Sequence, residues 1–342
     1  RIGSTSIAFV RTFYLYCKNG REKIMLNLKE IRKDPDFFKK KLSLRFVNNS
    51  DSLLEELLNN DEKLRKCLEE QQELQNRRNS ISKDLSMEKD RSVENFKKLS
   101  KEVSDIKSEI SLLENNILKF QGIINNILFS LPNIPMDDVP VSKDETGNKE
   151  VRNSGSVKIF DFKPLSHEVL ARQLDLIDFE TAVNISGSRF VILKKDLAKL
   201  ERALINFMID IHTSENGYSE YNVPILVNEK SMFGTGQLPK FKEEQFQTNN
   251  NLWLIPTSEV SLTNMVADKI VKYEDLPLRF VACTPCFRLE AGAAGKDTQG
   301  IMRQHQFSKV ELVSIIQPEF RIKELDRLLN CAEKILNLLK LP

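Results

Sequence analysis

The sequence has little of several features that mark particular classes of protein. Its 342 residues include 51 Lys and Arg against 49 Asp and Glu, so the formal net charge is only +2. A charge this small argues against a protein that coats nucleic acid by charge alone, although it leaves room for local basic patches. No apolar run approaches the roughly 20 residues of a membrane-spanning helix. We therefore expect no membrane partner.

Cysteine and histidine are also scarce. The five cysteines are odd in number and scattered, which is typical of a reducing compartment. Cys283 and Cys286 form a CxxC, a pattern found in redox pairs and in halves of zinc sites. No second CxxC occurs, and the chain has only three histidines to complete a zinc site. We interpret the pair as ordinary strand residues and predict no metal site in this chain.

The length suits two domains. Three prolines, Pro132, Pro135 and Pro140, fall in a polar stretch that we interpret as a linker over 131–150. It separates a helical domain at 25–130 from a mixed domain at 151–342. Residues 1–24 start with Arg and are basic, in the manner of an organelle transit segment. We prefer read-through ahead of a start at Met25.

The helical domain predicts an antiparallel pair of long helices. Asp34-Pro35 is a signal for a short helix before them. The polar stretch 86–95 can reverse the chain, and the second helix would be about 45 Å long. Such a coiled-coil arm projects from a globular body. The second helix has an unbroken heptad seam of Phe96, Leu99, Val103, Ile106, Ile110, Leu113, Ile117, Phe120 and Ile124.

The end of this arm is basic. A basic rod tip suits contact with the phosphates of RNA, read by shape rather than by base. An ordinary solvated coiled coil is the alternative, and the charges alone do not decide between the two. The basic residues near the tip are Arg77, Arg78, Lys83, Lys89, Arg91, Lys97, Lys98 and Lys101, against Asp84, Glu88, Asp90 and Glu94.

The second domain predicts an α+β fold, an antiparallel sheet with helices packed on it. Its first part has the pattern helix, helix, strand, long helix, and an amphipathic helix at Ile322–Leu339 closes the chain. Strands are expected near Glu220–Val227, Leu252–Pro256, Arg279–Phe287 and Gln304–Ile316.

The most informative stretch is 287–311, FRLEAGAAGKDTQGIMRQHQFSKVE. Two β-prone runs, Leu278–Phe287 and Ile301–Ile316, flank its Gly/Ala-rich turn and predict a hairpin with a long loop. The planar fork of Arg288 suits phosphate oxygens, and the ring of Phe307 offers a face to a base. This hairpin can therefore hold a nucleotide.

The string Phe-Arg-x-Glu, its loop and its return strand resemble motif 2 of the class II aminoacyl-tRNA synthetases. The fuller string, TPCFRLEAG followed by GIMRQHQFSKVE, resembles the seryl-tRNA synthetases. Three further segments agree in order. Leu254–Glu259 is similar to the TxE loop, Leu200–Val227 with Pro224 resembles the motif 1 dimer interface, and the heptad region resembles the tRNA-binding arm. The resemblance extends from Met25 to Pro342.

This resemblance implies a serine–tRNA ligase that forms seryl-adenylate from L-serine and ATP and transfers the seryl group to tRNA(Ser). Mg²⁺, a homodimer and a cytoplasmic location are implied with it, or an organelle if 1–24 is a transit segment. Arg288 would bind the α-phosphate, Glu290 the adenine amino group and Phe307 the adenine ring. The implied sites are Thr257, Ser258, Glu259 and Glu311 for serine; Arg288, Leu289, Glu290 and Phe307 for ATP; Arg77, Arg78, Lys83, Lys97 and Lys98 for tRNA; and Pro224 for the dimer.

The sequence departs from the family pattern in two places. Lys163-Pro164 is followed by Leu165-Ser166-His167-Glu168, where the family has two consecutive histidine or aromatic positions. The chain also stops at Pro342, before the family's motif 3 and the expected Mg²⁺ ligands. We therefore expect an incomplete, inactive site in this chain, and keep as the alternative a non-catalytic remnant that binds RNA or protein. No histidine is expected to act as a base: His167, His212 and His305 are interpreted as structural.

Overall fold

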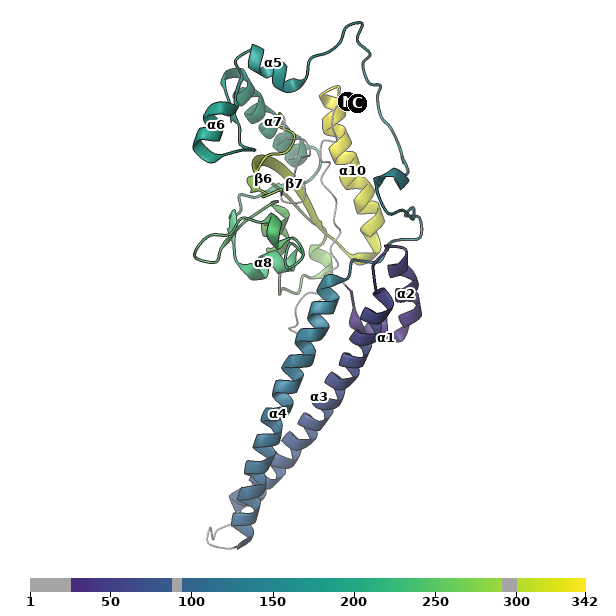
Figure 1. Cartoon of the computed structure of the whole chain (residues 1–342), viewed down its shortest axis with the longest axis vertical. Coiled ribbons are helices and arrows are strands. Elements are labelled where there is room, and N and C mark those ends of the chain that lie inside the picture. The colour runs from purple at the N-terminus through teal and green to yellow at the C-terminus, as the bar shows by residue number, and fades with distance from the viewer. Residues whose placement is uncertain (1–25, 88–93, 291–299) are drawn as a thin grey trace. The chain divides into compact units, whose positions relative to one another are not determined.

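The computed structural model describes residues 26–87, 94–290 and 300–342. The chain divides into two compact units, one ending at Val151 and the other extending from Arg152 to Pro342 (Figure 1). Three expectations concern residues outside the described ones. They are the leader at 1–24, the reversal of the arm with Lys89 and Arg91, and the middle of the hairpin loop at 291–299.

Two short helices, α1 (Leu28–Lys33) and α2 (Pro35–Ser43), begin the first unit. The Asp34 carboxylate accepts a hydrogen bond from the Phe37 N–H at 3.0 Å and caps α2. Pro35 stands at the first helical position, where a missing N–H costs nothing. The Asp34-Pro35 signal for a helix start is confirmed.

The two long helices are α3 (Ser50–Met87) and α4 (Glu94–Ser130), of 38 and 37 residues, and they lie side by side (Figure 1). A helix of the length of α4 measures about 55 Å, longer than expected because it continues to Ser130. The predicted arm is confirmed. Near the tip the seam contains Ile81, Ile106 and Ile110, packed with Leu74, Leu85, Leu99 and Val103.

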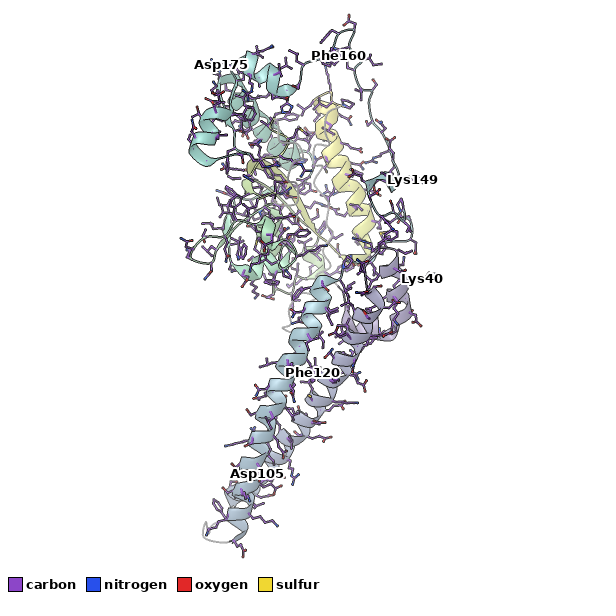
Figure 2. The ribbon with its side chains drawn as sticks, viewed as in Figure 1. Lys40, Asp105, Phe120, Lys149, Phe160 and Asp175 are labelled. Carbon is purple, nitrogen blue, oxygen red and sulfur yellow. The ribbon has the colours of Figure 1, made fainter. Side chains whose placement is uncertain are left out.

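The base of the arm has the larger apolar core, in which α1, α2, α3 and α4 meet around Ile31, Leu42, Leu54 and Leu128. Phe120, labelled in Figure 2, packs against it. One buried carboxylate, on Asp61 of α3, accepts from Arg32 Nη1 at 3.2 Å and from Arg65 Nε at 3.1 Å. The bond from Arg32 ties α1 to α3, while that from Arg65 lies within α3.

The second unit starts with α5 (His167–Gln173), β1 (Ile177–Asp178), α6 (Phe179–Ser186), β2 (Ile192–Leu193) and α7 (Lys195–Ser214). The predicted order of helix, helix, strand and long helix is confirmed, with β1 as an addition that pairs with β2. Asp175, labelled in Figure 2, has a φ of +52° and forms ion pairs with Lys194 and Lys195.

The central sheet has the order β3 (Ser219–Glu220), β6 (Leu278–Phe287), β7 (Gln306–Ile315). β6 and β7 form the predicted antiparallel hairpin. β3 joins β6 in parallel, a pairing that the sequence did not predict. β7 begins at Gln306 rather than at the expected Gln304, because the His305 N–H donates to the Arg189 carbonyl instead of to the ladder.

The strand expected over Glu220–Val227 is two strands. Pro224 lacks an N–H for a ladder, and the chain changes partner across it. β3 precedes it, while β4 (Leu226–Val227) follows and pairs with β5 (Trp253–Leu254) in a separate two-stranded sheet. The remaining α-helices are α8 (Glu229–Gly234), α9 (Glu259–Asn264) and α10 (Arg321–Leu338), and the short 3-10 turns are Glu145–Gly147, Lys242–Glu244, Tyr273–Asp275 and Pro318–Phe320.

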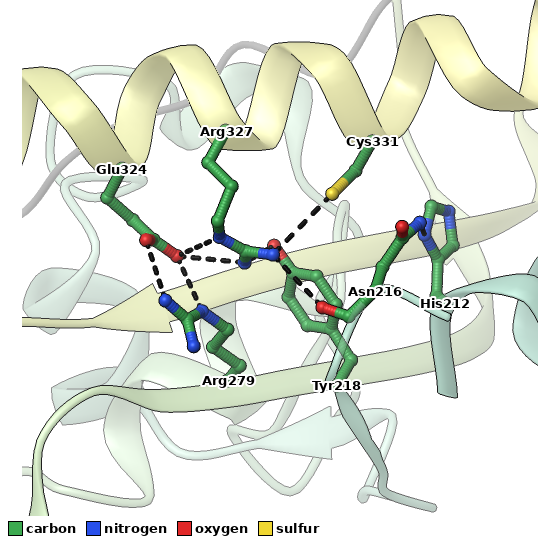
Figure 3. Close-up of polar contacts among 7 residues, drawn as sticks. All are labelled: His212, Asn216, Tyr218, Arg279, Glu324, Arg327 and Cys331. Carbon is green, nitrogen blue, oxygen red and sulfur yellow. Dashed lines mark hydrogen bonds and ion pairs between the residues drawn. The ribbon is translucent and has the colours of Figure 1, made fainter. Parts of the chain in front are cut away.

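α10 packs on the central sheet through a mixed apolar and polar face (Figure 3). Leu328 and Cys331 are buried against Tyr218 and Val281. Arg327 donates from Nη2 to the Tyr218 hydroxyl at 2.7 Å and from Nη1 to the Asn216 carbonyl at 3.0 Å. None of the helices that the structure describes combines the length and apolar character of a membrane span.

Candidate active site

One face of the β6–β7 hairpin brings together several of the candidate side chains. In the ladder, Phe307 is opposite Cys286, and Glu311 is opposite Ala282. Alternate residues of a strand point to the same face, so Phe307 and Glu311 share a face. Arg288 follows β6 on that face, and its guanidinium carbon lies 5.1 Å from the centroid of the Phe307 ring. The predicted phosphate and base ligands are therefore adjacent.

The TxE loop lies against this face. The Phe287 N–H donates to the Ile255 carbonyl at 2.9 Å, and Arg288 Nε donates to the Pro256 carbonyl at 3.3 Å. Thr257, the next residue, donates from Oγ1 to Glu311 Oε2 at 2.7 Å, and both side chains are buried. The structure thus brings Thr257 and Glu311 together with Arg288, although 54 residues separate the first two.

Ser258 and Glu259 have different positions in the loop. The Ser258 hydroxyl is fully buried and shares a 2.6 Å hydrogen bond with the Thr284 hydroxyl of β6. It therefore anchors the loop to the strand. Glu259 begins α9, and its N–H donates to Thr257 Oγ1 at 3.2 Å, which fixes the rotamer of the threonine.

Lys309 is a member of the site that the sequence reasoning missed. Its ammonium donates to Thr257 Oγ1 at 2.8 Å and forms an ion pair with Glu311. Its side chain is 20% exposed, so the pair is largely shielded from water. The alternation of Phe307, Lys309 and Glu311 along one strand was the signal that could have found it.

The residues that follow β6, at the loop end of the hairpin, are held by one backbone and one side-chain contact. The Leu289 N–H donates to the Glu244 carbonyl at 2.9 Å, while the Leu289 side chain is exposed. Glu290 has a φ of +51°, in the left-handed region, and its carboxylate accepts from Arg303 Nη1 at 3.0 Å. Arg303 thus lies beside the residue that the resemblance assigns to adenine.

The histidines have structural contacts. His305 Nδ1 donates to the Arg288 carbonyl at 2.8 Å, and its ring packs between Phe190 and Phe246. His167 Nε2 accepts from the Ile301 N–H at 2.9 Å. His212 is buried beside Asn216, and burial lowers its pKa to about 4. Each ring supports backbone or packing.

The two cysteines of the CxxC point to opposite faces of β6. Cys286 is buried on the face of Phe307, whereas Cys283 packs on the other face with Val310 and Leu312. Burial raises the pKa of both thiols. Within the described residues no group of three or more His, Cys, Asp and Glu side chains could hold a metal ion. The strand interpretation of the pair agrees with this geometry.

The remaining candidates lie apart from the hairpin. Pro224 is exposed, and its carbonyl accepts from the Ser261 hydroxyl at 2.7 Å. Arg77 of α3 forms an ion pair with Glu102 of α4, across the arm. Lys83, Lys97 and Lys98 are exposed, and Arg78 is half-buried.

Comparison with known proteins identifies the family. Residues 25–135 match the seryl-tRNA synthetase N-terminal domain, and residues 240–342 match the tRNA synthetase class II core domain (G, H, P, S and T). The serine–tRNA ligase of Ehrlichia canis (strain Jake) is 45% identical over 318 residues, covering 91% of this chain and 73% of that protein. The chain belongs to the seryl-tRNA synthetase family.

Other relatives agree. The serine–tRNA ligase of Brucella canis is 45% identical over 319 residues, 93% of this chain and 74% of that protein. Among solved structures, a seryl-tRNA synthetase from Pyrococcus horikoshii complexed with ATP matches with a TM-score of 0.81 and 32% identity, over 92% of this chain and 74% of that one. A cytoplasmic serine–tRNA ligase from Naegleria fowleri in complex with AMP matches with a TM-score of 0.74 and 27% identity, over 88% of this chain and 68% of that one. This chain therefore has the seryl-tRNA synthetase fold, which consists of a helical arm and a class II sheet domain.

Proposed function

We propose that this protein activates L-serine with ATP and transfers the seryl group to tRNA(Ser). The observation that supports this best is the 2.7 Å hydrogen bond from Thr257 to Glu311, which joins the TxE loop to the strand of Phe307 beside Arg288. It brings an amino-acid pocket next to a nucleotide platform. A non-catalytic remnant is not favoured, because the relatives are serine–tRNA ligases.

The first step needs positioning and charge stabilisation more than covalent help. The serine carboxylate is already an anion, so no general base is required, in keeping with the structural contacts of His305. Its oxygen attacks the α-phosphorus and pyrophosphate leaves. The Arg288 guanidinium would stabilise the charge on the α-phosphate oxygens. A ribose hydroxyl of the 3′-terminal adenosine of the tRNA then attacks the acyl carbon. The acyl–phosphate bond breaks, and AMP leaves with the hydroxyl proton.

The nucleotide half uses Arg288, Leu289, Glu290 and Phe307. The guanidinium of Arg288 now covers a face of the Phe307 ring, so it would move onto the phosphates as adenine stacks there. Glu290 would accept from the adenine amino group, and its bond to Arg303 orients the carboxylate for this. Leu289 keeps the hairpin edge in place through its N–H bond to Glu244.

The serine half uses Thr257, Glu259 and Glu311, with Ser258 as the anchor of the loop. Serine is small, so its hydroxyl and ammonium must be recognised by hydrogen bonds. A buried carboxylate left without a partner by alanine penalises that substrate strongly. Threonine would be rejected by the limited space.

Four further assignments belong to this proposal. Mg²⁺ would accompany the ATP phosphates, but the described residues offer it no group of three ligands, so none of them is assigned to it. The basic tip residues Arg77, Arg78, Lys83, Lys97 and Lys98 would contact tRNA(Ser) by its backbone. Motif 1 with Pro224 would form a homodimer interface. The bacterial relatives favour a cytoplasmic location.

The test is ATP–pyrophosphate exchange dependent on serine, measured on the whole protein. Arg288→Ala should lower the exchange rate by at least about 10²-fold, the usual cost of one charge-stabilising donor. Arg321→Ala, at the exposed start of α10, is the matched control and should retain the rate. Absence of serine-dependent exchange in a folded protein would contradict the proposal.

A further inference from the structure

Lys309 puts an ammonium group inside the serine pocket. Its Nζ contacts two side chains there: it donates to Thr257 Oγ1 at 2.8 Å and forms an ion pair with Glu311. The Glu311 side chain is 5% exposed and that of Lys309 is 20% exposed. A carboxylate buried this deeply is costly without a cation, and Lys309 supplies that cation.

The same two side chains, Thr257 and Glu311, are among those that the proposed function assigns to serine. Serine also brings an ammonium group, and it too needs a carboxylate and a hydroxyl to bind. Glu311 Oε2 already accepts from Thr257 and pairs with Lys309. Two ammonium groups at one carboxylate oxygen repel each other, so they would not occupy it together.

We propose that Lys309 is a placeholder for the substrate ammonium. In the free enzyme it neutralises Glu311 and holds Thr257 in the rotamer that serine needs. When serine binds, its ammonium takes over the contact with Glu311, and the Lys309 ammonium withdraws. This inference rests on the proposed function, because it needs serine to occupy this pocket.

The geometry permits such an exchange. Lys309 has a flexible four-carbon stem, so its ammonium can leave while its backbone stays in the ladder opposite Thr284. Thr257 does not depend on Lys309 alone, because the Glu259 N–H also donates to its hydroxyl at 3.2 Å. The pocket therefore keeps its shape during the exchange.

The exchange has a consequence for affinity. Serine must displace the Lys309 ammonium from Glu311. The new ion pair between serine and Glu311 therefore replaces an existing one, and the net gain in binding free energy is smaller. A ligand with a carboxylate and a hydroxyl but no ammonium, such as 3-hydroxypropionate, does not displace Lys309. For that anion the nearby positive charge of Lys309 is favourable. Removal of the charge should therefore affect the two ligands in opposite directions.

The experiment compares Lys309→Met and Lys309→Arg with the wild-type protein in serine-dependent ATP–pyrophosphate exchange. Lys309→Met removes the charge and nearly keeps the length. We expect its KM for serine to fall about fivefold or more, equivalent to about 1 kcal/mol. The inhibition constant of 3-hydroxypropionate should rise, and the KM for ATP should not change.

Lys309→Arg keeps the charge but can bind the Glu311 carboxylate with two parallel donors, so it should be harder to displace. We expect its KM for serine to rise, again without a change in the KM for ATP. This opposite result decides the question even if Lys309→Met does not fold. Lys323→Met, at an exposed position of α10, is the matched control and should change neither constant.

Several outcomes would overturn the inference. A higher serine KM in Lys309→Met would make Lys309 a direct ligand of serine. A higher ATP KM would make it a nucleotide ligand, and unchanged constants would leave it a structural residue. If serine and 3-hydroxypropionate both bind more tightly, the variant has relieved crowding rather than charge. A wild-type protein without exchange would refute the proposed function itself, and this inference with it.

Discussion

Glu324 of α10 and Arg279 of β6 form a two-point ion pair. Arg279 donates from Nε to Oε1 at 2.8 Å and from Nη2 to Oε2 at 2.9 Å (Figure 3). The Glu324 side chain is 9% exposed and also accepts from Arg327 Nε at 2.9 Å. One carboxylate thus fastens α10 to the middle strand of the sheet on which the site is built.

Removal of this carboxylate should destabilise the second unit. Glu324→Ala leaves the Arg279 and Arg327 guanidinium groups partly buried without their common anion. Breaking a buried pair in this way costs about 3 kcal/mol. Urea denaturation followed by circular dichroism measures the change in the free energy of unfolding. Glu319→Ala removes an exposed carboxylate that accepts from the Tyr273 hydroxyl; it is the control and should lose far less stability. An equal loss of unfolding free energy in both variants would show that the buried Glu324 network stabilises the fold no more than the exposed contact of Glu319.

The same region predicts how stability changes in acid. Burial alone would raise the pKa of Glu324, but hydrogen bonds from Arg279 and Arg327 outweigh it and lower the pKa from 4.5 to about 2. A depressed carboxyl pKa contributes stability above the unfolded-state value, and this is lost as the pH falls from 4.5 towards 2. The free energy of unfolding, measured at a series of pH values, should fall in that range. The fall should be smaller in Glu324→Gln, which cannot titrate.

His212 should add a second pH dependence of stability, in a less acidic range than that of Glu324. Burial lowers its pKa from 6.5 to about 4, so the folded protein prefers the neutral ring. The unfolded chain takes up the proton first as the pH falls, and stability is therefore lost between 6.5 and about 4. Denaturation of His212→Gln over this range should show a flatter dependence on pH than the wild type. A parallel dependence in the two proteins would refute the assignment.

The regular parts of the fold were predictable because local periodicity encodes them. The seam from Phe96 to Ile124 follows from the heptad repeat, and the hairpin from the β-prone runs on each side of its turn. Parallel addition of β3 to β6 was not predictable, since it depends on a contact between residues about 60 apart. A two-residue strand leaves no period to detect.

The candidate site also has a part that was predictable from the sequence and a part that was not. Arg288 and Phe307 were predicted as ligands because their residue types in this motif suit phosphate and base, and they lie side by side in the structure. Lys309 was missed because its meaning comes from Thr257, which is 52 residues away. A lysine between a phenylalanine and a glutamate has no distinctive pattern of its own, and only the folded loop gives it a partner.

The proposed platform for adenine gives a fourth prediction. Phe307→Ala removes the ring on which the base would stack, and stacking of a base on an aromatic side chain contributes about 1–3 kcal/mol. The KM for ATP in serine-dependent exchange should rise about tenfold, while the KM for serine changes little. Phe320→Ala, an exposed phenylalanine before α10, is the control. A rise in the serine KM alone would place the ring in the amino-acid pocket instead.

The arm gives the last prediction, which separates its role from that of the site. Lys97 and Lys98 are exposed on α4 near the tip, so their replacement by alanine should weaken tRNA binding without affecting serine-dependent exchange. Each lost phosphate contact should reduce the slope of log K against log salt by roughly 0.7 to 0.9. Filter binding of tRNA at several salt concentrations measures this. Lys119→Ala, exposed on the same helix nearer its base, is the matched control. If both changes weaken binding equally, the helix acts as a diffuse basic rod; if neither does, the arm is a coiled coil with no part in RNA binding.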